Sequence, residues 1–180
     1  RVVESVKQPC SLNRLSNLIK ATGTPCSPST VMEYVRYLQE SCLLISIDNY
    51  ASKFVEKETI KKHYFVDNGL LHLFINNPNT SLLENLCTIT LYKKYGKGLY
   101  YYNRNIEVDF YVPDEGLAVQ ASYQMSDEET IEREVKALVA LHGLYPLKRA
   151  MIITYEDEGE IVRDGLKIEI RPAWKWVLEG

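Results

Sequence analysis

Two carboxylates of this chain, Glu84 and Asp109, have the chemistry of metal ligands. Glu84 lies in a segment that predicts a helix, and Asp109 lies in the middle of a predicted strand, within Glu107-Val108-Asp109-Phe110. Aspartate is depleted from strands, whereas carboxylate oxygens are the hard ligands that Mg²⁺ prefers. Each residue also has a structural interpretation: Asp109 would discourage edge pairing, and Glu84 would be an exposed helix charge.

Hydrolysis assisted by Mg²⁺ also needs a positive group beside the attacking water and the developing charge. The next predicted strand presents Gln120-Ala121-Ser122 and no lysine. The nearest later lysine is Lys136, which lies on the following helix. Glu107 shares a strand face with Asp109 and is either a further ligand or an exposed charge.

Other catalytic motifs are absent from the sequence. It contains neither the phosphate-binding pattern G-x-x-x-x-G-K-[ST] nor a G-x-S-x-G nucleophile elbow. The cysteines and histidines have no metal-ligand spacing, so we expect reduced, mostly buried thiols and structural or surface histidines. These residues are Cys10, Cys26, Cys42, Cys87, His63, His72 and His142.

The carboxylates fall within a predicted order α-β-β-β-α-β. We place its last helix after Ser126, which forms a capping box with Glu129, and end that helix at Gly143. In metal-dependent nucleases of this order, acids on the first helix and on two adjacent strands hold Mg²⁺. The predicted elements are the helix 81–95, the strands 99–103, 106–113 and 117–123, the helix 126–143, the strand 149–155, a further strand 166–171 and a closing helix 172–178.

The first third predicts two helices and a β-ribbon. Ser11 and Ser27 are N-caps, and Pro28 occupies the first helical position of the second helix. The order helix, tight turn, helix and β-ribbon is typical of a winged helix. The predicted elements are the helices 11–21 and 28–41, the strands 43–47 and 62–66, the wing loop 48–61, and a core face of Val31, Val35, Leu38 and Cys42.

A winged helix serves either DNA binding or packing and protein contacts, and the sequence leaves both open. The candidate nucleic-acid-binding residues are Arg36 on the second helix and Lys53, Lys57, Lys61 and Lys62 on the wing. Glu33 and Glu40 on the same helix oppose contact with phosphate.

Charge is distributed unevenly along the chain of 180 residues. Residues 1–62 carry 9 Lys+Arg against 6 Asp+Glu, and residues 63–180 carry 12 against 18, so the net charge changes from +3 to −6. This asymmetry favours two modules: a winged-helix domain over 1–68 and an α/β (α+β) domain over 69–180.

No apolar run approaches the roughly 20 residues of a membrane-spanning helix, so we expect no membrane contact. The chain begins Arg1-Val2-Val3 without Met or a signal-peptide pattern. We therefore expect a cytoplasmic protein and a fragment of a longer chain.

Several segments together resemble one family. The most specific are Tyr64 to Leu71 and Glu107-Val108-Asp109-Phe110. The others are Ser29-Thr30-Val31 with Tyr34, Leu38 with Leu43-Leu44, Leu83-Glu84-Asn85-Leu86 and Val119-Gln120-Ala121-Ser122. The resemblance covers nearly the whole chain and is to the C-terminal region, of uncharacterised function, of a group of prokaryotic AAA-type ATPases. It implies a winged helix followed by a restriction-endonuclease-like domain of the PD-(D/E)XK superfamily.

The resemblance implies Glu84 and Asp109 as the matching acids of a nuclease site. Where an active member has Glu-x-Lys, this chain has Gln120 and Ser122, so we expect a degenerate and inactive site. The expected function is binding of DNA or a partner protein, coupled to an N-terminal ATPase domain that would bind ATP and Mg²⁺. Two alternatives remain: an Mg²⁺-dependent nuclease with Glu84 and Asp109 as metal ligands, and a DNA-binding regulator acting through the winged helix.

Overall fold

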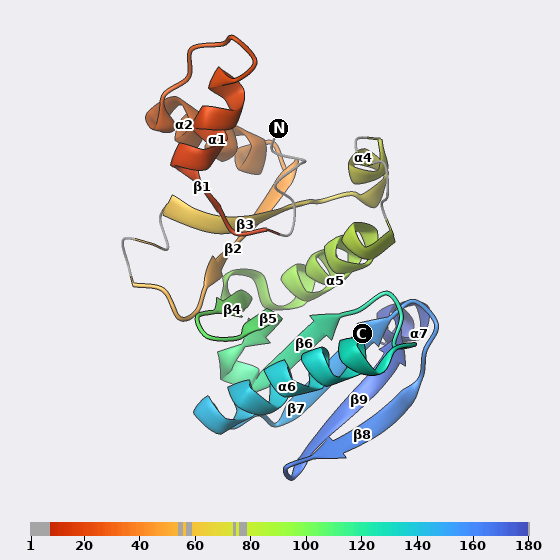
Figure 1. Ribbon diagram of the computed structural model, residues 1–180. Coiled ribbons are helices and arrows are strands. Elements are labelled where there is room, and N and C mark those ends of the chain that lie inside the picture. The colour runs from red at the N-terminus through yellow and green to blue at the C-terminus, as the bar shows by residue number, and fades with distance from the viewer. Residues whose placement is uncertain (1–7, 54–55, 57–58, 74, 76–78, 180) are drawn as a thin grey trace.

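The computed structural model describes residues 8–53, 56, 59–73, 75 and 79–179. Over these residues the protein is a mixed α/β structure built on one large sheet (Figure 1). The strands are β1 (Cys10–Ser11), β2 (Leu44–Asn49), β3 (Ile60–Phe65), β4 (Tyr100–Asn103), β5 (Glu107–Val112), β6 (Leu117–Ala121), β7 (Arg149–Thr154), β8 (Gly159–Arg163) and β9 (Leu166–Pro172). The helices are α1 (Leu12–Lys20), α2 (Pro28–Glu40), α4 (Asn68–His72), α5 (Asn79–Tyr95), α6 (Glu128–Leu144) and α7 (Ala173–Glu179), with short 3₁₀ turns at Gly96–Gly98 and Pro113–Glu115.

The two N-terminal helices begin where the sequence predicts. The Ser11 side chain accepts a hydrogen bond from the Arg14 amide, and the Ser27 side chain accepts one from the Thr30 amide. Both helices pack on a small core of Cys10, Leu15, Cys26, Val31 and Val35. The prediction that Cys42 completes this core face is wrong: Cys42 follows the end of α2 in a left-handed conformation with φ 54° and is exposed.

The sheet crosses the domain boundary that we predicted at residue 68. Its strand order is β1-β3-β2-β4-β5-β6-β7-β9-β8, and β2 joins β4 by parallel pairing of Asp48 with Tyr100 and of Asn49 with Tyr101. Asn49 strengthens this short junction, because its side chain bonds both the N–H (3.0 Å) and the C=O (2.6 Å) of Asn103. The β2–β3 hairpin therefore belongs to the same sheet as the later strands.

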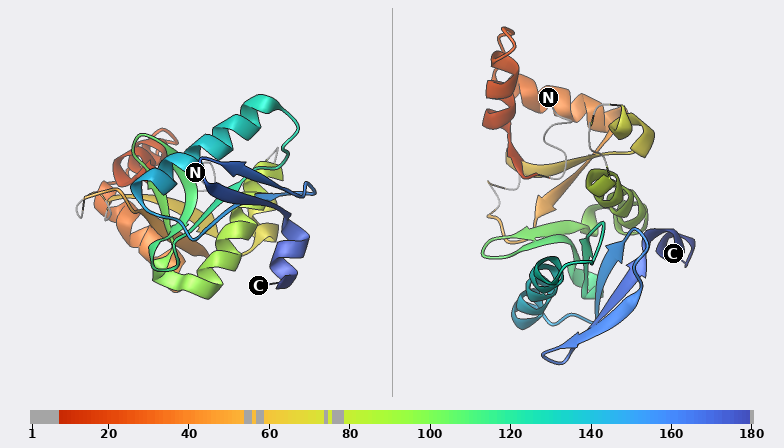
Figure 2. Two further views of the ribbon diagram at one scale, coloured as in Figure 1. Left: turned by 90° about the horizontal axis from the view of Figure 1, so that it is seen from below. Right: turned by 45° about the vertical axis from the view of Figure 1, so that its right-hand side comes forward.

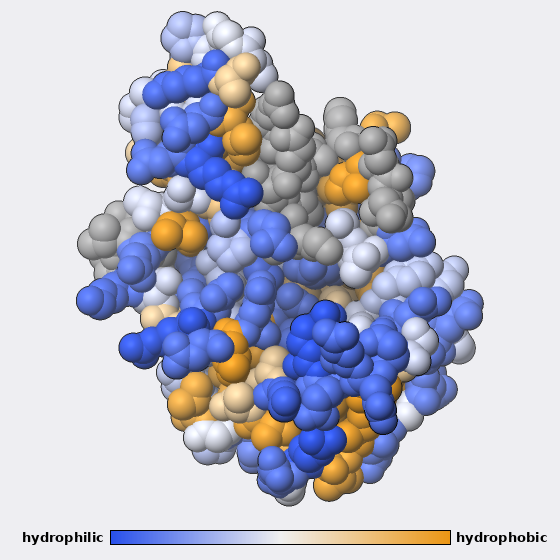
Figure 3. Space-filling model, viewed as in Figure 1, coloured by the Kyte–Doolittle hydropathy of each residue, from blue (hydrophilic) through white to orange (hydrophobic). Residues whose placement is uncertain are grey.

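Helices cover both faces of the second half of the sheet (Figure 2). One buried cluster unites α5 and α7 with the sheet and includes Tyr64, Cys87 and Phe110. The other lies beneath α6 and includes Val135 and Leu138. The exposed surface around α6 is largely hydrophilic, as expected for an amphipathic covering helix (Figure 3).

The predicted start and end of the α6 helix both differ from the structure. The N-cap of α6 is Asp127, which accepts a 2.7 Å hydrogen bond from the Thr130 amide, so Ser126 is not the cap. Gly143 lies inside α6, and the helix closes two residues later with the Tyr145 amide on the Leu141 carbonyl. Helix α4 and strand β8 were not predicted: α4 has five residues behind a local cap by Asp67, and β8 is held by pairing with β9. Among the described helices, none has the length and apolarity needed to cross a bilayer.

Candidate functional site

Helix α5 buries two neighbouring polar side chains, those of Glu84 and Asn85, against the sheet. Asn85 bonds the Phe65 backbone twice, accepting from its N–H (2.8 Å) and donating to its C=O (2.9 Å), which fixes α5 against β3. Glu84 is consequently only 6% exposed, and its Oε1 accepts a 2.7 Å hydrogen bond from the Tyr64 hydroxyl. The alternative interpretation of Glu84 as an exposed helix charge is wrong.

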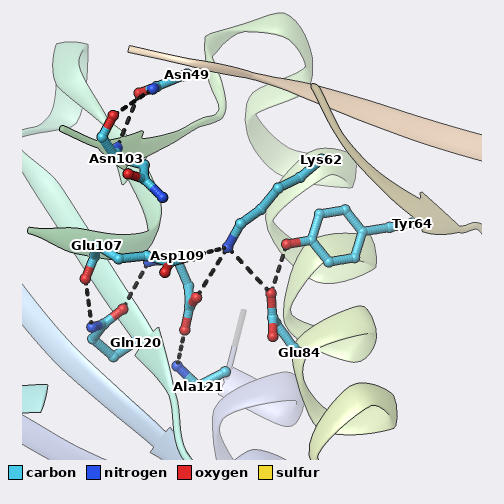
Figure 4. Close-up of polar contacts among 9 residues, drawn as sticks. All are labelled: Asn49, Lys62, Tyr64, Glu84, Asn103, Glu107, Asp109, Gln120 and Ala121. Carbon is cyan, nitrogen blue, oxygen red and sulfur yellow. Dashed lines mark hydrogen bonds and ion pairs between the residues drawn. The ribbon is translucent and has the colours of Figure 1, made fainter. Parts of the chain in front are cut away.

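Asp109 sits in a β-bulge of β5. The register between β4 and β5 shifts between Tyr100 and Tyr102, so that one residue of β4 opposes both Asp109 and Phe110. A bulge bends the strand and redirects the side chain. Asp109 therefore points toward α5, and its Oδ2 accepts a hydrogen bond from the Ala121 amide at 3.1 Å (Figure 4). Because β4 and β6 flank β5, Asp109 is not an edge-strand charge.

Gln120 faces the backbone of β5. Its Oε1 accepts a 2.7 Å hydrogen bond from the Asp109 N–H, and its Nε2 donates to the Glu107 carbonyl at 3.2 Å. The backbone pairing of β5 with β6 ends at Phe110 and Val119, so the Gln120 amide bonds the β5 backbone just beyond the end of this ladder. Ser122 is buried, and its Oγ donates to the Gln124 carbonyl at 3.1 Å.

The segment that carries Gln120 and Ser122 has no lysine, but β3 brings Lys62 to the same place. Lys62 is buried, and its Nζ lies 3.0 Å from Glu107 Oε1, 3.3 Å from Asp109 Oδ1 and 3.6 Å from Glu84 Oε1. We call Lys62, Glu84, Glu107 and Asp109 the acid–lysine cluster (Figure 4). The structure thus brings Glu84 and Asp109 together around an ammonium group, with Gln120 adjacent.

Electrostatics keep this cluster charged. Burial alone lowers the pKa of Lys62, but the negative charges of Asp109, Glu84 and Glu107 outweigh burial and raise that pKa above its ordinary value. Burial, followed by the charge of Glu84, raises the pKa of Tyr64. At neutral pH Lys62 is therefore an ammonium ion, and Tyr64 remains a protonated hydrogen-bond donor.

A cavity of about 420 Å³ lies beside the cluster, between the sheet and α6. Beyond the cluster residues, its lining includes Gln120, Arg133, Glu134 and Lys136. Burial raises the pKa of Glu134, which bonds Arg133 at 2.7 Å. Lys136 is mostly exposed and pairs with Glu132 at 3.6 Å. The cavity therefore holds acids and bases that are largely paired with one another.

This arrangement does not fit a resident Mg²⁺ ion. Among the described residues, no three His, Cys, Asp or Glu side chains converge in a way that could hold a metal. The Lys62 ammonium lies between the oxygens of Glu84 and Asp109 that a cation would need. Gln120 bonds backbone groups with both ends of its amide.

Of the candidate nucleic-acid-binding residues, Lys62 belongs to the acid–lysine cluster, whereas Arg36, Lys53 and Lys61 are not part of it. Arg36 pairs with Glu40 at 3.7 Å on α2 and packs on the ring of Tyr37. Lys61 pairs with Asp48 at 2.7 Å. Lys53 is exposed, and Lys57 lies outside the described residues.

Three residues of the site escaped the sequence analysis: Lys62, Tyr64 and Glu134. The assignment of Lys62 to an exposed wing is wrong. Lys62 and Tyr64 are two apart on one strand and so share a face, and pairing of β3 inside the sheet buries that face. This alternation could have indicated the burial of Lys62. Glu134 precedes the apolar residue Val135, and its inward position had no signal in the sequence.

Comparison with known proteins finds a similar sequence whose function is uncharacterised. The chain is 31% identical over 183 aligned positions to "Uncharacterized protein MJ1544" of Methanocaldococcus jannaschii, an alignment covering 93% of this chain and 40% of the relative. The chain thus spans about two fifths of the length of that relative. No family model matches the chain, and no solved structure matches it.

Proposed function

We propose that this chain is a binding and regulatory region of a larger ATPase, with a nuclease-like site that has lost catalysis. The position of the Lys62 ammonium, within 3.6 Å of three carboxylates, carries the proposal. A longer relative, of which the chain spans 40%, is compatible with an additional domain. In this proposal α1, α2 and the β2–β3 hairpin form a winged helix, and the elements from α5 to β7 form the nuclease-like unit.

Charge and geometry both disfavour catalysis at the acid–lysine cluster. The buried ammonium of Lys62 is ion-paired with three carboxylates, those of Glu84, Glu107 and Asp109. It is therefore poorly placed to polarise a water molecule, and it competes with a divalent cation for the same oxygens. Gln120 supplies no charge, and Ser122 supplies no cation.

The decisive experiment combines metal binding with DNA cleavage. We expect calorimetry at millimolar Mg²⁺ or Mn²⁺ to detect no binding, and plasmid or single-stranded DNA to remain intact. The control variants are Asp109→Asn in the cluster and Asp114→Asn in an exposed turn. Metal-dependent cleavage that is lost in Asp109→Asn and kept in Asp114→Asn would overturn the proposal.

A second candidate function is an Mg²⁺-dependent nuclease. The observation that favours it is the lysine itself: Lys62 provides, from β3, the ammonium that Ser122 lacks. The adjoining cavity also presents the carboxylate of Glu134. Because Lys62 now blocks the acids, this candidate requires the cluster to rearrange on binding DNA. It predicts DNA cleavage in the wild type that Lys62→Met abolishes, whereas the first proposal predicts none in either protein.

DNA binding through the winged helix has weaker support. Arg36 and Lys61, two of its candidate contacts, are already paired with Glu40 and Asp48. Binding to phosphate would have to break these pairs. Fluorescence anisotropy with duplex DNA tests it: true binding falls steeply with salt and weakens in Lys53→Ala.

A further inference from the structure

A second cavity, of about 560 Å³, lies between α5 and α7 on the face of the sheet opposite α6. Figure 2 shows α5 and α7 together on this face. Leu86 and Ile89 of α5, Met151 of β7 and Trp176 of α7 provide apolar lining. We call this cavity the α5–α7 groove. Its size is typical of a binding site.

The groove has a positive rim. Lys93 and Lys94 line it from the last turn of α5, and within the described part of the chain neither pairs with a carboxylate. Two other charged residues of the lining, Arg149 and Glu179, are already paired with Glu169 and Arg171.

The unbalanced charge of the groove is therefore positive. It is unusual in its setting, because residues 63–180 carry 12 Lys+Arg against 18 Asp+Glu. Net charge alone would make this region repel acidic partners, so the two lysines create a local exception beside an apolar surface.

We propose that the α5–α7 groove binds an acidic amphipathic segment of a partner protein. Apolar side chains of the segment would cover Leu86, Ile89 and Trp176, while its carboxylates would face Lys93 and Lys94. A nucleic acid fits less well: its phosphates could meet Lys93 and Lys94, but the apolar lining of Leu86, Ile89 and Trp176 offers its sugars and backbone no polar partners. The inference rests on the proposed binding function and assigns it a surface.

The test is a selection from a displayed library of random 16-residue peptides against the whole chain. We expect enriched peptides to combine Asp or Glu with apolar residues at helical spacing. Anisotropy with these labelled peptides should show at least tenfold weaker binding to Lys93→Glu/Lys94→Glu and to Val177→Glu, which lines the groove. Leu178→Glu is the matched control, because Leu178 is 80% exposed and lies outside the lining; its affinity should stay within twofold.

Three results would overturn the proposal: no enrichment of acidic peptides, equal binding to all variants, or displacement of the peptides by a DNA oligonucleotide that also loses affinity in the lysine variant. If the protein self-associates and Val177→Glu abolishes this association, the groove binds a second copy of the chain, and the proposal of an acidic partner segment is overturned. None of these results touches the metal and cleavage assays, which concern the acid–lysine cluster. DNA cleavage in those assays would overturn the proposed non-catalytic function, but it would not change the conclusion from the peptide-binding data about the α5–α7 groove.

Discussion

The Lys62 Nζ on β3 lies 3.3 Å from Asp109 Oδ1 on β5, although β2 and β4 separate these two strands in the sheet. The lysine side chain reaches across the face of the sheet and passes the Tyr101 ring of β4, with Nζ 5.4 Å from the ring centroid. A residue of the N-terminal hairpin thereby neutralises part of the charge at the centre of the later strands.

Removal of the Lys62 charge should destabilise the fold strongly. Lys62→Met leaves buried Glu84 and its neighbours without a counter-charge, which costs about 3–5 kcal/mol for a broken buried pair. Urea unfolding at pH 7 measures the loss. Lys61→Met is the matched control: the Lys61–Asp48 pair is partly exposed, and such pairs contribute about 0–1 kcal/mol. Similar losses in both variants would contradict the importance of the cluster.

Gln120→Glu should destabilise the protein without creating a metal site. The change removes the Nε2 donor, so that a carboxylate oxygen faces the Glu107 carbonyl. An unsatisfied buried acceptor costs about 1–3 kcal/mol. Urea unfolding and Mn²⁺ calorimetry test both expectations, with exposed Gln124→Glu as the control. A stable variant that binds Mn²⁺ would show that position 120 can still act as a ligand.

His63 should make the protein less stable in mild acid. Burial, assisted by the charge of Lys61, lowers the pKa of His63 to about 4, below the ordinary value of about 6.5. Between these values the unfolded chain binds a proton that the folded protein does not, so stability falls as pH drops from 6.5 toward 4. The contribution lost between pH 7 and pH 5 is on the order of 2 kcal/mol.

Urea unfolding at the two pH values measures this effect. His63→Gln should remove most of the pH dependence, whereas exposed His72→Gln should retain it. An unchanged slope in His63→Gln would assign the acid sensitivity to other groups.

Asn49 should hold the junction between β2 and β4. Asn49→Ala removes three hydrogen bonds, two with Asn103 and one with the Ala51 amide. The expected loss is roughly 3 kcal/mol, from about 1 kcal/mol for each bond. The same substitution should accelerate hydrogen exchange of the β4 amides. Asn105→Ala, in an exposed turn, should leave both measurements unchanged. Equal exchange in the two variants would contradict the role of Asn49 at this junction.

The local elements were predictable because their signals are local. Ser11 and Ser27 fix the starts of α1 and α2 through hydrogen bonds within four residues. Pro28 adds a backbone already restricted to the helical φ at the first position of α2. The cap of α6 was misplaced by one residue, because Ser126 and Asp127 are both good caps and only the observed bond to Thr130 distinguishes them. Strand β8 was missed because its five residues, mostly exposed, are held by pairing with β9.

The sequence alone determined most helices, most strands and the two acids Glu84 and Asp109, since capping and hydrophobic periodicity act over a few residues. Only the tertiary structure decided what surrounds those acids. The bulge that turns Asp109, the amide of Gln120 on the backbone and the approach of Lys62 all depend on which strands become neighbours. A buried charge is tolerated only with a partner, and the partner of these acids lies 22 residues before Glu84 and 47 before Asp109.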